Sequence, residues 1–241
     1  MHEITARELN RLDAQGWRDI LSGPSETALR WLHAAAEQGV IEAQVNLAQR
    51  YLEGRGCDAD PTQALAWLRL AANEGHPMGM NLLGRCYENG WGLKKDDVMA
   101  TYWFRQAALT GLDWGQYNYA TSLALGRGAP ADLAQALDFF RKAAGQGHAK
   151  SWNFVGSFHE DGWAVPRDLE QALACYLRAA QGQDFRGAFN AARLLADQGK
   201  SDQALPLLRQ AWEQGHPAFR GQMRAYLQAH PVKALRELRL Q

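Results

Sequence analysis

The feature that most constrains this chain is a repeat of 36 residues. Trp31, Trp67 and Trp103 are separated by that spacing, and two further steps reach Phe139 and Cys175, both apolar. The same period links alanines at 28, 64, 100, 136 and 172, glycines at 39, 75, 111 and 147, and aspartates at 60, 96, 132 and 168. So many columns in register indicate a tandem array, and a period between about 20 and 50 residues is typical of a solenoid.

Each unit is predicted to form two helices. In the segment 41–53 the apolar residues recur at helical spacing, and Gly54 ends the segment. Asp60 then begins a second helix as its N-cap, with Pro61 in the first helical position and Gln63 three residues after the cap. Gly75 ends that helix, because glycine readily adopts a left-handed cap. The sequence therefore predicts helix-turn-helix units of about 36 residues.

These columns resemble the Sel-one-like repeat (SLR) family, a relative of the tetratricopeptide repeats. The unit that begins at Ala43 follows the family pattern with Ala43, Asn46-Leu47-Ala48, Tyr51, Gly54-Arg55-Gly56-Cys57, Asp60, Ala64, Trp67, Ala71-Ala72 and Gly75. Cys57 and Ala129 stand where the family usually has valine, and Cys175 stands where it has tryptophan. The resemblance implies an all-α, right-handed superhelical solenoid. It also implies recognition of other proteins, often in bacteria.

The two ends of the array are predicted to be capping units, since terminal repeats need a polar outer face. We expect an N-terminal capping helix in residues 1–24, repeats in 25–216, and C-terminal capping helices in 217–241. Thr5 and Glu8 form a capping box for a first helix that Gly16 is expected to end. Pro231 is expected to begin a short final helix containing Arg236 and Arg239.

One junction inside the array breaks the pattern. Gln183 stands where a helix-ending glycine is expected, although Gly182 precedes it, and the next unit is four residues shorter than the others. Because a neighbouring glycine can end a helix one residue earlier, the shift need not destroy the helix. We expect an irregular junction between residues 182 and 200, where the superhelix changes curvature or two rigid segments meet.

Composition argues against several classes of function. The chain has 26 basic residues (Lys and Arg) and 26 acidic residues (Asp and Glu), so its net charge is zero. It therefore lacks the excess of basic residues that a dedicated nucleic-acid binder usually has. No apolar stretch approaches the roughly 18 residues of a membrane span, and the charged first 15 residues do not resemble a signal peptide. The three cysteines lack CxxC spacing, which favours reduced thiols and no metal. We therefore expect a cytoplasmic protein without cofactor or metal.

The sequence offers no catalytic constellation. It contains no GxxxxGK loop, GxSxG elbow or HExxH helix. His76, His148 and His216 share one repeat position, which favours a turn residue over a catalytic base. His159, Glu160 and Asp161 form a polar run that we interpret as a solvated helix end, because adjacent residues on a helix do not face each other. Cys57 lies in a glycine-rich loop, where a reactive role would require a lowered pKa.

The first helix of each unit is predicted to line a concave face, by analogy with tetratricopeptide solenoids. The predicted partner-binding groove consists of Asn81, Arg85, Trp114, Tyr117, Lys150, Asn153, Arg186, Phe189 and Arg193. Aromatic residues and arginine dominate protein-binding hot spots, and asparagines could bond the backbone of an extended peptide. A competing interpretation is that the aromatics Trp114 and Tyr117 pack against the next unit.

The sequence therefore predicts a non-enzymatic scaffold or adaptor that binds a partner protein or peptide in this groove. One alternative is an inhibitor or immunity-type protein that blocks a partner enzyme. A further alternative is an enzyme on a helical scaffold, which would need an unrepeated polar cluster that the sequence does not show. A weaker alternative is a single-strand nucleic-acid binder that uses stacked aromatics and arginines, against which the neutral charge counts.

Overall fold

The chain is all-α across residues 4–229, the part that the computed structural model describes. The helices are α1 (Ala6–Leu9), α2 (Ala14–Ser22), α3 (Ser25–Glu37), α4 (Ile41–Glu53), α5 (Pro61–Asn73), α6 (Pro77–Asn89), α7 (Asp97–Leu109), α8 (Asp113–Leu125), α9 (Leu133–Gly145), α10 (Ala149–Asp161), α11 (Leu169–Gln181), α12 (Phe185–Asp197), α13 (Ser201–Gln214) and α14 (Pro217–Ala229). From α2 to α8, and again from α9 to α13, each helix packs against the next, which confirms the predicted helix-turn-helix solenoid.

The predicted caps set the helix boundaries. A carboxylate oxygen of Asp60 accepts bonds from the backbone N–H groups of Thr62 and Gln63, both at 3.0 Å, at the start of α5. Asp96 and Asp168 cap α7 and α11 in the same way, and Asp132 caps α9 by accepting from the Gln135 N–H. At the other end of α4, Gly54 adopts φ 67°, a left-handed conformation that glycine reaches without a Cβ clash.

The alanine column provides the close contact between layers. Ala64, Ala100, Ala136 and Ala172 are at most 3% exposed. Large side chains pack beside them, and Leu68, Phe104, Phe140 and Tyr176 are fully buried on the second helices. The repeat tryptophans Trp31, Trp67 and Trp103 are partly buried against this core, which fits their predicted structural role.

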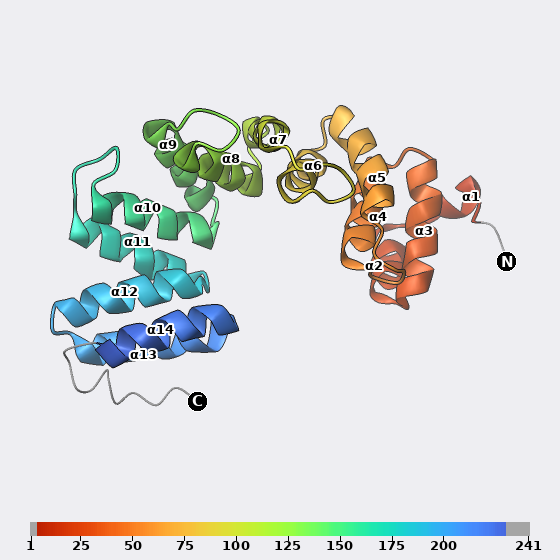
Figure 1. Cartoon of the computed structure of the whole chain (residues 1–241). Helices are drawn as coiled ribbons and strands as arrows, with labels where there is room; N and C mark the ends of the chain where they lie inside the picture. Colours follow the sequence, from red (N-terminus) through yellow and green to blue (C-terminus); the bar gives the residue numbers. More distant parts are fainter. Residues whose placement is uncertain (1–3, 230–241) are drawn as a thin grey trace. The chain divides into compact units, whose positions relative to one another are not determined.

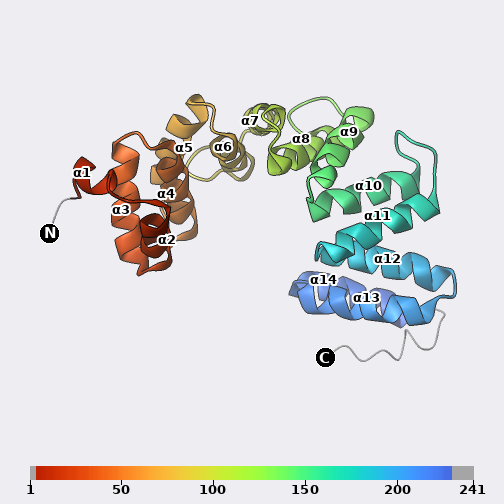
Figure 2. The ribbon, with the colours of Figure 1, turned by 180° about the vertical axis from the view of Figure 1, so that it is seen from behind.

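The chain divides into two compact units between Ala131 and Asp132. Unit 1 contains α1–α8, and unit 2 contains α9–α14. Within unit 2, α10 to α13 lie in successive layers, as the two opposite views show (Figures 1 and 2). Each unit has its own buried core.

The N-terminal prediction was partly wrong. Thr5 and Glu8 form the capping box, but the helix they begin ends at Leu9. Gly16 does not end it. Gly16 lies inside a separate helix, α2, because Asp13 acts as an N-cap and accepts a 2.7 Å bond from the Gly16 N–H. The predicted helix at Pro231, with Arg236 and Arg239, lies outside the described residues.

At the predicted junction, residues 182–200, the first helix keeps the spacing of the repeat and only the turn after it is shortened. The helix α11 ends at Gln181, and Gln183 itself takes the left-handed position with φ 63°. Helix α12 then begins 36 residues after α10. The shortening falls in the turn between α12 and α13, where Gly199 is left-handed. The division between compact units lies elsewhere, after Ala131.

Candidate functional site

The predicted groove residues lie on the first helices of individual repeats, and these repeats are found in both compact units. Asn81 and Arg85 come from α6, and Trp114 and Tyr117 come from α8, all in unit 1. The unit 2 residues are Lys150 and Asn153 on α10, with Arg186, Phe189 and Arg193 on α12. Their role in binding a partner stays a prediction, and their surroundings differ strongly.

The two asparagines are used inside the fold. Asn81 is 3% exposed, and its side-chain oxygen accepts a 2.8 Å bond from Nδ2 of Asn118. Asn153 is 7% exposed and accepts a 2.9 Å bond from Nδ2 of Asn190. These bonds join α6 to α8 and α10 to α12. The amides therefore orient the first helices within each unit, whereas the sequence had suggested contacts with a peptide backbone.

Unit 1 contains an open cavity beside Arg85. Its volume is about 300 Å³. It is lined by Gln49, Leu52, Glu53, Pro61, Leu82, Arg85 and Trp91. The Arg85 guanidinium lies 5.1 Å from the centre of the Trp91 ring, within the range of a cation–π contact. The one carboxylate in the lining, Glu53, is paired with Arg55. The cavity thus combines apolar walls with an exposed cation.

The other aromatic residues predicted for the groove of unit 1 lie on α8. Trp114 is 40% exposed, and its ring meets that of Tyr117 edge-on with centres 6.2 Å apart. Tyr117 is half-buried. An exposed aromatic next to a supported one is typical of contact sites, because the ring loses little conformational freedom on binding.

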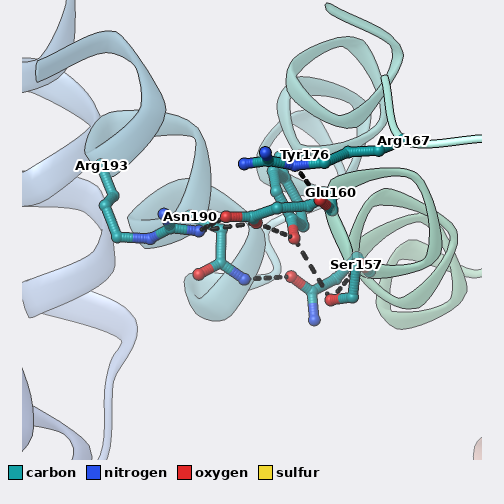
Figure 3. A network of polar contacts seen from close by, with 7 residues as sticks. Ser157, Glu160, Arg167, Tyr176, Asn190 and Arg193 are labelled. Atoms are coloured by element: carbon teal, nitrogen blue, oxygen red, sulfur yellow. Dashed lines mark hydrogen bonds and ion pairs between the residues drawn. The ribbon is translucent and has the colours of Figure 1, made fainter. Parts of the chain in front are cut away.

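Unit 2 has a polar network on the corresponding helices (Figure 3). Arg193 on α12 places Nη2 2.5 and 2.6 Å from the two carboxylate oxygens of Glu160 at the end of α10. The hydroxyl of Tyr176 on α11 donates to Glu160 at 2.7 Å and lies 3.2 Å from the Ser157 hydroxyl. Arg167 donates to the backbone oxygen of Glu160 at 2.9 Å. Three helices are therefore joined at one carboxylate.

The groups of this network are largely shielded from water. Burial raises the pKa of Tyr176 well above its usual value, so the hydroxyl remains protonated and donates to Glu160. The side chains of Glu160 and Arg193 are 17% and 26% exposed. The prediction that Glu160 lies at a solvated helix end was wrong, because Arg193 and Tyr176 cover it. A signal was available: Arg193 follows Glu160 by 33 residues, close to one repeat.

Fewer of the cations predicted for the groove of unit 2 are exposed than the sequence suggested. Lys150 and Arg186 are exposed, whereas the charge of Arg193 is matched by Glu160. Phe189 packs edge-on against Phe219 and Tyr226, with ring centres 5.6 and 5.2 Å apart. Phe189 therefore belongs largely to the core between helices.

Asp184 adds a buried carboxylate near the exposed cations of unit 2. It is 5% exposed and accepts a 2.7 Å bond from the Gly187 N–H at the start of α12. Burial raises its pKa, and the Gly187 N–H and the charges of Arg186 and Lys150 oppose that shift. Part of the positive charge at this end of unit 2 is thus balanced within the fold.

The histidines and cysteines behave as structural residues. His76 and His216 cap helices, since Nδ1 of each accepts a backbone bond, from Gly79 at 3.1 Å and from Phe219 at 3.3 Å. Burial, followed by the nearby charge of Asp58, raises the pKa of Cys57, which does not favour a reactive thiolate. Within residues 4–229, no group of three or more His, Cys, Asp or Glu side chains could hold a metal. No helix in this range is long and apolar enough to cross a membrane.

Comparison with known proteins identifies the repeat. The model of the Sel1 repeat matches residues 25–40, 41–76, 77–111, 115–148 and 153–184. Helices α12 and α13 follow the last match as one more helix pair. A comparison with curated protein sequences gives no match.

Solved structures share the fold. A protective antigen of uropathogenic Escherichia coli that displays an SLR fold is 29% identical, with a TM-score of 0.75 over 92% of this chain and 50% of that one. The present chain thus spans about half the length of that antigen. A Sel1 repeat protein from Oxalobacter formigenes is 23% identical, with a TM-score of 0.78 over 90% and 86% of the two chains. An immunity protein from Pseudomonas aeruginosa is 22% identical, with a TM-score of 0.55 over 83% of each chain. The repeat matches cover more than half of the sequence, and the chain belongs to the Sel1 repeat family.

Proposed function

We propose that this protein is a non-enzymatic interaction scaffold. It binds a segment of a partner protein on the face of unit 1 that the first helices of its repeats form. The observation that carries the proposal is the cavity of about 300 Å³ beside Arg85 and Trp91. Its lining combines apolar side chains with an arginine and a tryptophan, the residue types that supply most binding energy in protein interfaces. Sel1 repeats generally serve as such scaffolds.

The chemistry of the cavity suggests what it binds. An apolar side chain of the partner would bury against Leu52, Leu82 and Trp91 and lose its contact with water. A carboxylate next to that side chain would pair with Arg85, which is already held against the Trp91 ring. The exposed Trp114 offers a second apolar contact in the same unit. The proposed ligand is therefore an apolar and acidic peptide segment.

Unit 2 is proposed to contribute charge to the same activity. Among the groove residues predicted for unit 2, Lys150 and Arg186 are the exposed cations. Their exposed charges would attract acidic partner residues, while Arg193 and Phe189 support the helices on which Lys150 and Arg186 lie. We propose that the activity takes place in the cytoplasm of a bacterial cell, which the three free cysteines favour.

Peptide selection tests the proposed function. A displayed library of peptides is panned on the full chain and, in parallel, on Arg85→Ala and Trp91→Ala variants. We expect selected peptides to bind the two variants at least about tenfold more weakly, the effect of one hot-spot residue. Arg69→Ala, which changes an exposed arginine on α5, serves as the matched control. Peptides that bind all four proteins equally would show that the cavity is not the binding site.

The blocking of a partner enzyme is the second candidate function. It would use the same surface and would appear as tight one-to-one binding with loss of the enzyme's activity. The fold shared with an immunity protein is compatible with it, but 22% identity supports only the likeness in fold.

A further inference from the structure

Helix α7 carries an exposed apolar stripe on its outer side. Val98, Tyr102 and Leu109 are 63%, 48% and 62% exposed, and Arg105 is exposed between them. At 100° per residue these four side chains point in nearly the same direction. The opposite side of the helix is buried through Phe104 and Ala107. The stripe therefore faces away from the core of unit 1 along most of the helix.

The stripe is specific to this repeat. At the positions of Val98, Tyr102 and Leu109, the other second helices have Thr62, Ala66 and Asn73 in α5, Ala134, Asp138 and Gly145 in α9, and Glu170, Ala174 and Gln181 in α11. All nine of these residues are exposed. The repeat architecture thus requires no large apolar residue at these positions. Large exposed apolar residues aligned on one helix face are typical of an interaction site.

The order of the four residues is self-complementary. Val98 and Leu109 lie equally far from the midpoint between Trp103 and Phe104, and so do Tyr102 and Arg105. In an antiparallel pair of α7 helices with a two-fold axis at that midpoint, each residue lies level with its counterpart. Apolar Val98 then meets Leu109 of the second copy, and the ring of Tyr102 meets the guanidinium of Arg105.

We propose that α7 is a homodimer interface, occupied by α7 of a second copy of this chain in antiparallel orientation. A two-fold interface requires that residue i meets j while j meets i, and the stripe satisfies this condition twice. The Tyr102 ring is held edge-on against Trp103, with centres 5.1 Å apart, so it is oriented before the copies meet. Facing an arginine, it can form a cation–π contact on both sides of the axis.

A single helical stripe buries less than the roughly 800 Å² per partner of a stable complex. We therefore expect a reversible dimer with a Kd on the order of 10–100 µM. Sedimentation equilibrium of the full chain, over concentrations that bracket this range, measures it. A chain that stays monomeric throughout would overturn the proposal.

The antiparallel register is tested with paired charges. Val98→Glu alone and Leu109→Lys alone each place a charge against an apolar residue of the other copy. We expect each to raise the Kd at least about tenfold. In the double variant Val98→Glu/Leu109→Lys, the two new charges of opposite sign face each other twice, and we expect most of the loss to be recovered. A double variant that associates no better than the single variants would overturn the antiparallel arrangement.

The matched control is Leu70→Glu, which changes a residue that is 50% exposed on α5. It should leave the Kd unchanged. An equal loss in this control would indicate general apolar association and would overturn the assignment to α7. Melting temperatures of all variants are measured beside the Kd values, and they should agree, because every substituted side chain is exposed.

Discussion

Two sets of three consecutive helices, 72 residues apart in the sequence, share the same helical arrangement but differ in their polar contacts. Each set of three helices is called a layer. In unit 1 the layer consists of α6, α7 and α8, and in unit 2 it consists of α10, α11 and α12. Both have an asparagine pair in which one side chain is buried, with bonds of 2.8 and 2.9 Å. Both also place a buried ring against a glycine: Phe104 against Gly84, and Tyr176 against Gly156.

The layers diverge at the rim of this shared core. The positions of Tyr176, Glu160 and Arg193 correspond to Phe104, Glu88 and Thr121 in unit 1. Unit 1 thus has the carboxylate without the phenol hydroxyl or the arginine. Among the described residues, Glu88 forms no ion pair. The comparison shows that the shared core residues determine how the three helices pack. The three rim residues determine whether the polar groups at the surface pair with one another.

The largest expected effect tests the shared part of the comparison. Phe104→Ala and Tyr176→Ala each remove a fully buried ring. Each should lower the free energy of unfolding by about 3–5 kcal/mol, since the cavity left behind adds to the lost burial. Urea unfolding followed by circular dichroism measures both. If one variant lost less than about 1 kcal/mol, its ring would not hold a comparable place in the core.

The next effect tests the rim. Glu160→Ala leaves Arg193 without its carboxylate and the Tyr176 hydroxyl without its main acceptor. Because these groups are mostly buried, the loss should be about 1–3 kcal/mol in the free energy of unfolding. Glu88→Ala is the control at the corresponding position of unit 1 and should change stability by less than about 0.5 kcal/mol. Equal losses in the two variants would contradict the difference between the units.

A smaller effect concerns the hydroxyl alone. Tyr176→Phe gives unit 2 the ring of unit 1 and should cost about 1 kcal/mol, the net value of one hydrogen bond. The reverse experiment places Phe104→Tyr and Thr121→Arg together beside Glu88. Their combined effect should exceed the sum of the single effects by about 0.5–1.5 kcal/mol in favour of folding. A purely additive result would show that the network needs more than these residues.

Local rules explain why most of the fold was predictable. The N-cap at Asp60 and the helix-ending Gly54 act within a few residues, and the period of 36 copies them along the chain. The same rules failed at Gly16, where a single residue, Asp13, begins a new helix. A short polar segment offers several competing caps, and tertiary packing selects among them.

The site was harder to predict, because its chemistry depends on pairs from different repeats. Arg193 was predicted to line the groove and Glu160 to lie at a solvated helix end, and sequence alone does not show that their side chains meet. The asparagine pairs are 37 residues apart and the ion pair 33, so both offsets lie close to the period. The cavity beside Arg85 depends on where the loop places Trp91, which periodicity does not determine.

The smallest expected effect compares the turns that end the second helices. Gly39, Gly75, Gly111 and Gly147 take the left-handed position in four repeats, and Gln183 takes it in the fifth, with φ 63°. A left-handed residue with a Cβ costs about 1 kcal/mol or more. Gln183→Gly removes this cost, but the freer unfolded chain takes back part of the gain. We expect a net stabilisation of about 0.5 kcal/mol.

The reverse change provides the matched control for this prediction. Gly147→Gln introduces a side chain at the same turn of the preceding repeat, where an added Cβ would meet no atom within 4 Å. The cost should therefore come from φ 95° alone, and we expect a loss of about 1 kcal/mol. For a chain of this size, about 1 kcal/mol shifts the melting temperature by roughly 2–4 °C, so calorimetry of both variants resolves the two signs. A loss of stability in Gln183→Gly would mean that the Gln183 side chain contributes more through its contacts than its backbone costs, and the turn after α11 would then be held differently from the four turns that have glycine at this position.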